Sequence, residues 1–200
     1  LTVHGRATHA SMRWDGVSAI EKYTGLHNAI IKLEELRHHS FETKHYKSKE
    51  RVAPINIGTI KAGQWHSTVP ESIIAEGRLG VFPNESNEEA RKNFEDHVFE
   101  FSKSDSWLTE NPPEIEWFEG QFESGQTPVD DPLIKELSSV YKNVLNREAV
   151  IEGVTYGSDL RLFTNHAHIP SVLFGPGDVR LAHAANEYVT IEEIMFSTEV

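Results

Sequence analysis

The first half of the chain alternates between two hydrophobic patterns, one typical of strands and the other of helices. Residues 73–81 place apolar or small side chains at every second position, which predicts a strand with one buried face. Residues 90–101 instead repeat apolar side chains every three or four positions, as an amphipathic helix does. The elements expected before residue 125 are, in order, strand 1–3, helix 16–38, strand 55–60, strand 73–81, a helix opened by residues 86–89, and strand 115–122.

The order of these elements predicts a fold class. Strand, helix, strand, strand, helix, strand (β-α-β-β-α-β) is typical of an antiparallel sheet that carries two helices on one face, the ferredoxin-like plan. We expect Asp15 to cap the first helix and the capping box Ser86–Glu89 to start the second. The first helix should bury one apolar face, made of Val17, Ile20, Ile30, Leu33 and Leu36.

The pattern changes after Gly125, where helices alternate with short apolar strands. The elements expected there are, in order, a helix from Asp131, a strand over 149–151, a helix over 159–165, a strand over 171–174 and a helix capped by Thr190. Such short, apolar strands are typical of a parallel sheet that is buried on both faces. We therefore divide this α+β chain into a ferredoxin-like lid, residues 1–124, and the C-terminal α/β portion of an incomplete domain, residues 125–200.

Net charge limits the expected partners. The 200 residues carry 31 acidic and 19 basic side chains, a formal net charge of −12, whereas nucleic acids and anionic membranes require a cationic surface. We therefore expect no nucleic-acid partner and no membrane partner. The absence of cysteine excludes thiolate chemistry and favours a cytoplasmic location. Because the chain begins with Leu1 rather than Met, we expect it to be a piece of a longer protein.

Three short segments carry candidate functional chemistry. Residues 171–174 lead through a Gly-Pro-Gly turn into a loop with His183, a position typical of a metal ligand or a general base. Gly157–Asp159 is expected at a strand-to-helix junction, where backbone amides can bind a substrate carboxylate. His9, in a loop of small residues, could donate to an oxyanion. Each segment also has a purely structural interpretation, as a surface histidine or as a helix cap.

Together these segments resemble a known family. The resemblance is carried by the stretches Gly5–Ser11, Asp15–Ile20, Lys61–Glu71, Gly157–Asp159, Phe174–Gly177 and Ala182–Val189. In this order and spacing they are similar to the lid and C-terminal signatures of the dizinc acylamino-acid hydrolases. That family includes acetylornithine deacetylase, succinyl-diaminopimelate desuccinylase, aminoacylase and carboxypeptidase G. Each stretch alone has low specificity, but together they cover nearly the whole chain.

The resemblance implies roles for individual residues. His183 would be a zinc ligand, and His9 would reach across a dimer interface to stabilise the oxyanion in the partner's site. The family often has an Arg where this chain has Gly80. The implied substrate-binding residues are Gly157, Ser158, Asp159, Ser67, Arg78 and Arg161.

The implied reaction is the removal of the acyl group from an N-acyl amino acid, as in an acetylornithine deacetylase, by water that bridges two zinc ions. Cobalt or manganese could replace zinc. One alternative is a metallo-carboxypeptidase or dipeptidase of the same family, which would cleave a peptide. Another is a dimerisation or binding module without catalysis. In each case the lid would form a homodimer, through its exposed strand edge or through helix 16–38.

The other zinc ligands that the resemblance implies have no counterpart in these residues. No histidine is followed two positions later by an aspartate, and a zinc site needs at least three protein ligands. We therefore expect these 200 residues alone to lack hydrolase activity and the complete protein to have it. An unrelated ferredoxin-like binding protein would instead place Asp159 and His183 far from any shared cleft.

Overall fold

The chain folds as two compact units in the computed structural model, which describes residues 1–42, 45–48 and 51–200. Unit 1 comprises residues 1–124 together with 154–156, and unit 2 comprises residues 125–153 and 157–200.

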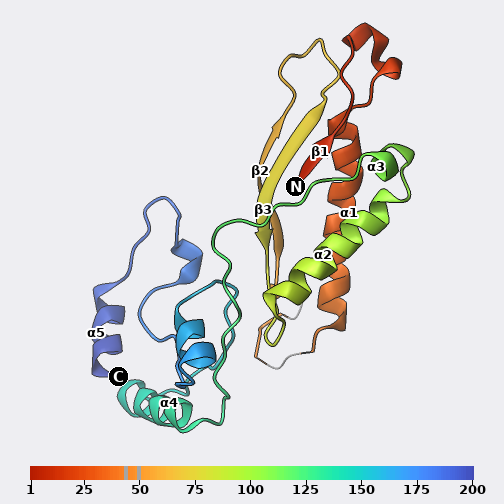
Figure 1. Cartoon of the computed structure of the whole chain (residues 1–200). Coiled ribbons are helices and arrows are strands. Elements are labelled where there is room, and N and C mark those ends of the chain that lie inside the picture. The colour runs from red at the N-terminus through yellow and green to blue at the C-terminus, as the bar shows by residue number, and fades with distance from the viewer. Residues whose placement is uncertain (43–44, 49–50) are drawn as a thin grey trace. The chain divides into compact units, whose positions relative to one another are not determined.

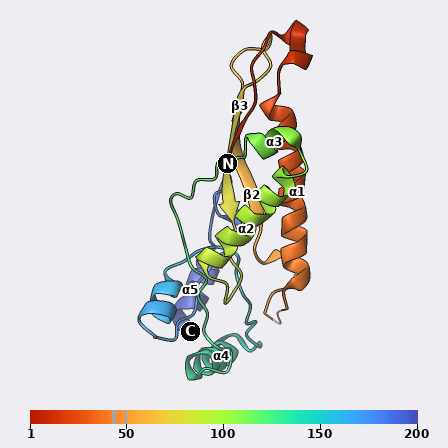
Figure 2. The same ribbon diagram turned by 45° about the vertical axis from the view of Figure 1, so that its right-hand side comes forward.

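Unit 1 is an antiparallel sheet with two helices on one face (Figures 1 and 2). Its elements are β1 (Thr2–His4), the 3-10 helix η1 (Ala10–Asp15), α1 (Ala19–Ser40), β2 (Ile55–Ala62), β3 (Ser72–Leu79), α2 (Asn87–Ser102) and α3 (Ser106–Glu110). The strand order is β1-β3-β2, and β3 is antiparallel to both neighbours. Both views show α1 and α2 on the same side of the sheet. The predicted α+β fold class is therefore confirmed.

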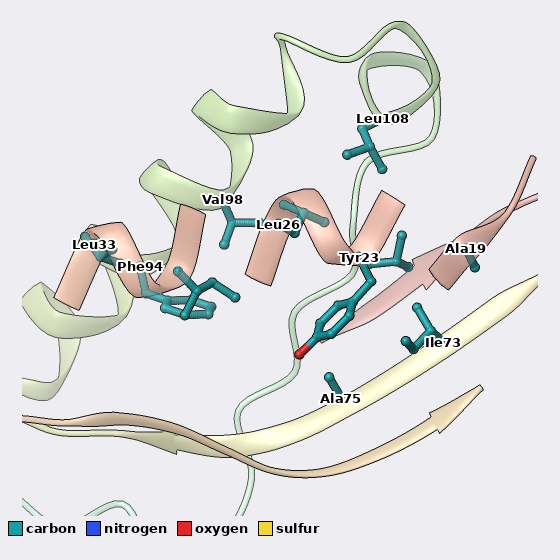
Figure 3. Close-up of a cluster of buried hydrophobic side chains, with 11 residues drawn as sticks. Ala19, Tyr23, Leu26, Leu33, Ile73, Ala75, Phe94, Val98 and Leu108 are labelled. Carbon is teal, nitrogen blue, oxygen red and sulfur yellow. The ribbon is translucent and has the colours of Figure 1, made fainter. Parts of the chain in front are cut away.

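The core of unit 1 lies between the sheet and the two helices (Figure 3). Leu26 of α1 is fully buried, and it belongs to the same cluster as Ile73 of β3 and Val98 of α2. The predicted alternation of β3 is confirmed in its first half, where Ile73 and Ala75 are buried and Ile74 and Glu76 are exposed. Gly77, expected on the buried face, is exposed, and Leu79 is half-buried. Burying each of these large apolar side chains contributes about 1.5–3 kcal/mol, so this cluster provides most of what stabilises unit 1.

The predicted buried face of α1 is confirmed only in part, at Ile30 and Leu33. Ile20 and Leu36 are 45% and 50% exposed, and Ser18 rather than Asp15 caps the helix, since its hydroxyl accepts the Glu21 amide at 3.3 Å. The prediction selected the most apolar residues and overlooked small and amphipathic ones. The face that the structure buries keeps a regular spacing of three and four positions along Ala19, Tyr23, Leu26, Ile30 and Leu33.

The predicted strand 115–122 is wrong as a strand. At the start of this segment, Glu114 exchanges backbone hydrogen bonds of 2.8 and 2.9 Å with Thr2 of β1, as an isolated bridge. Beyond that pair, Trp117 turns toward α2: its indole N–H donates to Glu95 at 2.7 Å, and its ring meets Phe94 edge to face at 5.6 Å. Side-chain packing on α2 therefore replaces the ladder that a fourth strand would form beside β1.

Unit 2 contains α4 (Pro132–Leu145), a π-helical turn η3 (Leu162–His166), a 3-10 turn η4 (Val179–Leu181) and α5 (Ile191–Glu199). The predicted caps are confirmed. Asp131 accepts the Leu133 amide at 2.8 Å, and Thr190 forms a capping box with Glu193. The helix predicted over 159–165 is a shorter turn that begins later.

The strands predicted in unit 2 do not form. Residues 149–151 and 171–174 are irregular, and their apolar side chains are largely exposed. The second segment is instead fixed by Thr127, whose hydroxyl accepts the Ser171 amide at 2.9 Å and donates to the Ser171 carbonyl at 2.6 Å. A strand needs a hydrogen-bonded neighbour, and the described residues of unit 2 provide no partner strand. Among the described helices of the chain, none is both long and apolar enough to span a bilayer.

Asp105 offers a direct test of the α1–α3 packing. Its carboxylate accepts the Trp107 and Leu108 amides at 2.9 and 3.1 Å and pairs with Lys22 at 2.7 Å. Burial raises the pKa of Asp105, but the Lys22 ammonium and these amides outweigh it and hold the pKa below its ordinary value. We expect Asp105→Ala to lower the free energy of unfolding by about 1–2 kcal/mol at pH 7.

The effect should depend on pH in one direction. A carboxyl group whose pKa is lowered by folding contributes stability above its unfolded pKa of about 3.9, and this contribution is lost as the pH falls through the folded value. Urea unfolding of wild type and variant should therefore converge below about pH 4. Asp96→Ala is the control, because Asp96 forms only an exposed pair with Lys92 and should cost less than about 0.5 kcal/mol. Equal losses for both variants would contradict this packing.

Candidate functional site

The structure brings two of the predicted site residues together at one end of unit 1. His9 and Thr68 form an antiparallel bridge, and the Ala10 amide donates to the Ser67 carbonyl at 2.9 Å. On the other side of the bridge, the Val69 amide donates to Thr8 at 2.9 Å. Figure 1 shows η1, which follows His9, beside the connection from β2 to β3. The small residues around His9 therefore allow this loop and the β2–β3 connection to lie side by side.

The ring of His9 is oriented by Ser11. The Ser11 amide donates to Nδ1 of His9 at 3.2 Å, and the Ser11 hydroxyl lies 2.7 Å from the same nitrogen. Because a backbone N–H can only donate, Nδ1 is the unprotonated nitrogen, and in the neutral ring Nε2 carries the hydrogen. His9 is exposed, so this N–H is available to a ligand. The sequence interpretation missed Ser11, although its position two residues after His9 is the usual spacing of such a turn.

A hollow of about 370 Å³ lies beside these loops at the start of α1. Its lining includes Ala10, Thr68, Arg13 and Lys22. Both cations are already paired, Arg13 with Glu21 at 2.8 Å and Lys22 with Asp105 at 2.7 Å. The charges of these two cations are therefore already neutralised by carboxylates within unit 1.

Arg78 and Gly80 lie at the other end of β3 from Ser67. Arg78 pairs in register with Asn56 and is exposed on the strand, on the face opposite to Ile73 and Ala75. A Cβ on Gly80 would lie 2.5 Å from the Ala53 carbonyl carbon and 2.6 Å from its Cα. This close approach of two backbones leaves no room for a side chain at Gly80.

The remaining predicted site residues belong to unit 2. The Ser158 hydroxyl accepts the Leu160 amide at 3.3 Å, and the Asp159 carbonyl accepts the Leu162 amide at 2.9 Å. Both bonds lie just before η3, whose N-cap residue, Arg161, makes no side-chain capping bond. Arg161 is half-buried at the start of the same turn. Gly157 is exposed just before it. Ser158 thus makes a local bond to the following backbone, and a carboxylate site at this segment stays a prediction.

His183 is exposed in a left-handed backbone conformation, with φ at 61°. Its amide donates to the Glu187 carboxylate at 3.1 Å, which fixes the loop and leaves the ring at the surface. In the described part of the chain, no group of three His, Cys, Asp or Glu side chains could hold a metal ion. A zinc ion needs at least three protein ligands, so these residues do not make up a metal site by themselves.

Gly5 positions the His9 loop and can be tested directly. A Cβ there would lie 2.2 Å from the Val17 carbonyl oxygen and 2.7 Å from the Ala19 nitrogen, both backbone atoms that cannot move aside cheaply. We expect Gly5→Ala to lower the free energy of unfolding by about 2 kcal/mol or more. Gly58→Ala is the matched control, because its nearest atom would be an ordinary 3.7 Å contact. Thermal and urea unfolding that ranked the two variants equally would contradict this close approach of the backbone at Gly5.

Comparison with known proteins identifies the family. A family model described as the peptidase dimerisation domain, M20_dimer, matches residues 1–105. The chain is 28% identical over 206 residues to the N-formyl-4-amino-5-aminomethyl-2-methylpyrimidine deformylase of Bacillus subtilis, covering 96% of this chain and 46% of the relative. It is 26% identical to a probable carboxypeptidase of Paracoccidioides brasiliensis, covering 100% of this chain and 41% of the relative.

The fold is also shared with a solved structure. The di-peptidase Dug1p from Saccharomyces cerevisiae matches with a TM-score of 0.67 and 12% identity, over 99% of this chain and 51% of that protein. The chain therefore spans about half the length of the relatives it matches. The match over residues 1–105, more than half of the chain, shows that this protein belongs to the M20 family and carries its peptidase dimerisation domain.

Proposed function

We propose that the complete protein is a metal-dependent hydrolase of linear amide bonds, in which residues 1–124 form a dimerising lid and residues 125–200 belong to the catalytic domain. The observation that carries this proposal is His9, held by Ser11 with an exposed Nε2–H, at one end of a peptidase dimerisation domain. A fixed N–H donor of this kind is suited to stabilise the oxyanion that forms when water attacks an amide carbonyl.

The proposed metal is zinc, with cobalt or manganese as substitutes. His183 is the ligand proposed from this chain, because its ring is exposed and its loop is fixed through Glu187. The described residues do not complete a metal site, so the other ligands would come from further residues of the complete protein. When bound, a zinc ion would supply an activated water molecule for amide hydrolysis.

The proposed substrate is an N-acyl amino acid, with Gly157, Ser158 and Asp159 near its carboxylate. The second candidate is a peptide cleaved by a carboxypeptidase or dipeptidase activity. It is favoured by two of the similar proteins, a probable carboxypeptidase and a di-peptidase. The deformylase relative adds formyl amides to the compounds to be screened.

The activity can be tested on the complete protein. We expect zinc-dependent release of the acyl group from at least one N-acyl amino acid, or cleavage of a dipeptide, in a panel that covers both. His9→Ala should lower kcat by about 10²–10³-fold, the usual cost of losing one oxyanion donor. His183→Ala should weaken zinc binding as well as turnover, since it removes a ligand.

Two exposed histidines provide matched controls. His66 lies in the β2–β3 connection near the His9 loop, and His168 shares the exposed, left-handed conformation of His183 in unit 2. His66→Ala and His168→Ala should keep both activity and zinc binding. Absence of metal-dependent turnover on the whole panel, or equal losses in the control variants, would contradict the proposal.

The proposed homodimer would form beside the open edge of β2. In the strand order β1-β3-β2, the described sheet ends at β2, so one side of that strand has no neighbouring strand. Ile20 and Ile31 of α1 are 45% and 49% exposed, and their spacing of three turns places them on one side of the helix. An open strand edge beside exposed apolar side chains is suited to pair with a second copy.

Contacts of α1 show which flank of the helix carries Ile20 and Ile31. The flank toward α2 is marked by His97, whose ring bonds the Ala29 carbonyl at 2.9 Å. The flank toward β2 is marked by Glu34, one turn after Ile31, whose carboxylate accepts the Ile55 amide. Ile20 and Ile31 therefore lie on the flank beside β2, next to the open edge.

Ile31→Asp should weaken dimerisation about tenfold or more, because it buries a charge at the proposed interface. Leu36→Asp is the control, since Leu36 is equally exposed but lies about 140° around the helix from Ile31. Sedimentation velocity of the complete protein across micromolar concentrations measures both. A wild-type protein that stays monomeric, or equal weakening by both variants, would contradict this interface.

A further inference from the structure

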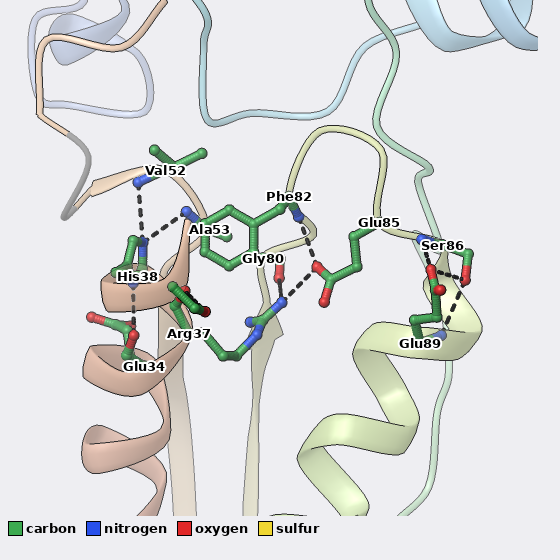
Figure 4. Close-up of polar contacts among 11 residues, drawn as sticks. Glu34, Arg37, His38, Val52, Ala53, Gly80, Phe82, Glu85, Ser86 and Glu89 are labelled. Carbon is green, nitrogen blue, oxygen red and sulfur yellow. Dashed lines mark hydrogen bonds and ion pairs between the residues drawn. The ribbon is translucent and has the colours of Figure 1, made fainter. Parts of the chain in front are cut away.

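The chain enters β2 through backbone amides that donate to side chains of α1, and Figure 4 shows those of Val52 and Ala53 bound to His38. The Val52 and Ala53 amides donate to Nε2 of His38 at 3.2 and 3.1 Å. Pro54 has no N–H. The next amide, that of Ile55, donates to the carboxylate of Glu34. Every backbone donor from Val52 to the first residue of β2 is thus accepted by one of two titratable side chains of α1.

The hydrogen bonds of His38 allow only one form of its ring. Its Nδ1 lies 2.8 Å from the Glu34 carbonyl oxygen, which can only accept, so Nδ1 carries a hydrogen. Its Nε2 faces two backbone N–H groups, which can only donate, so Nε2 must be unprotonated. A proton added to Nε2 would point at two donors and would break both bonds.

The surroundings of His38 offer no other place for that proton. The side chain is only 4% exposed, so water cannot replace the lost bonds. The Phe82 ring meets His38 edge to face at 5.1 Å, and the guanidinium of Arg37 lies 5.0 Å above the same Phe82 ring. Arg37 is itself bound to the Gly80 carbonyl at 3.0 Å and to Glu85 at 2.7 Å (Figure 4). A second positive charge would therefore arise beside a buried cation.

We propose that His38 and Glu34 form an acid-sensitive clamp that holds residues 52–55 against α1 and opens when His38 takes up a proton. In the closed form, Nε2 accepts two amides; in the open form, Nε2 binds one proton and the amides of Val52 and Ala53 bind water. The clamp rests on the fold alone, and it does not depend on the proposed hydrolase activity or on the proposed dimer.

The sign of the pH dependence follows from proton uptake on opening. A free histidine titrates near about pH 6.5, and below that value the open form binds a proton that the closed form cannot bind. The open population should therefore rise about fivefold over the first pH unit below that value and approach about tenfold for each further unit.

Other charged groups also face the clamp. Among the described residues, these are Arg37, Glu34 and Glu85, which contact His38 or its partners. Burial raises the pKa of Tyr46, which packs against the same apolar cluster, so it stays neutral. Loss of the response in a His38 variant is therefore the observation that would assign it to His38.

Hydrogen exchange of the complete protein tests the clamp. The amides of Val52 and Ala53, corrected for the intrinsic pH dependence of exchange, should lose about fivefold in protection between pH 6.5 and 5.5. Amides of the α1 core, such as Ile30, should keep theirs. His38→Gln should remove the dependence on pH. His97→Gln is the matched control and should retain it, because the ring of His97 donates to a carbonyl and keeps that bond when protonated.

Two results would overturn the proposal. Protection of Val52 and Ala53 that is equal at pH 5.5 and 7.5 would exclude an acid-sensitive clamp, as would a His38→Gln variant with the dependence of wild type. If that variant fails to fold, the nitrogen chemical shifts of His38 in the wild-type protein decide. The Nδ1–H form at pH 8 is expected, and the Nε2–H form would contradict the proposal.

Discussion

Burial of one face of α1 between the sheet and α2 is the constraint on which the rest of unit 1 depends. Once Leu26 and its neighbours in the cluster are packed, the rotation of α1 about its axis is fixed. That rotation decides which side chains of α1 face the β2 edge, where His38 and Glu34 meet the chain entering β2, and where the loops before α1 can return to the sheet. The His9 loop, the open β2 edge and the proposed clamp are all consequences of this single packing choice.

The sequence was sufficient to predict the elements whose signals are local. The capping boxes at Ser86 and Thr190 and the alternation in the first half of β3 appear as predicted, because they depend only on neighbouring residues. The face of α1 was predicted only in part, because tertiary packing selected Ala19 and Tyr23 over the more apolar Ile20 and Leu36. The strand predicted over 115–122 does not form for a similar reason: the Glu95 side chain of α2 binds Trp117, and no local pattern reports that contact.

For the candidate site, too, the sequence predicted local motifs but not the contacts between them. Sequence motifs indicated His9, Ser67 and His183 individually, and the structure joins His9 and Ser67 through paired backbone segments. The orientation of the His9 ring by Ser11 could not be predicted from the sequence, because it depends on which ring nitrogen faces the Ser11 amide. The segments 149–151 and 171–174 were predicted as strands but are irregular. An apolar sequence alone does not form a strand, because a strand needs hydrogen-bonded neighbours. His38 shows that a scattered histidine without a motif can still hold a structural position.

In the proposed dimer, His9 of one subunit serves the site that contains His183 of the other. Mixing the His9→Ala and His183→Ala forms of the complete protein, followed by reassociation, tests this arrangement. In a mixed dimer, one of the two sites would combine an intact His183 with the partner's intact His9. Random pairing should then restore about a quarter of wild-type activity from two variants that are each nearly inactive. A mixture that forms mixed dimers and stays as inactive as its components would contradict the exchange of His9 between subunits.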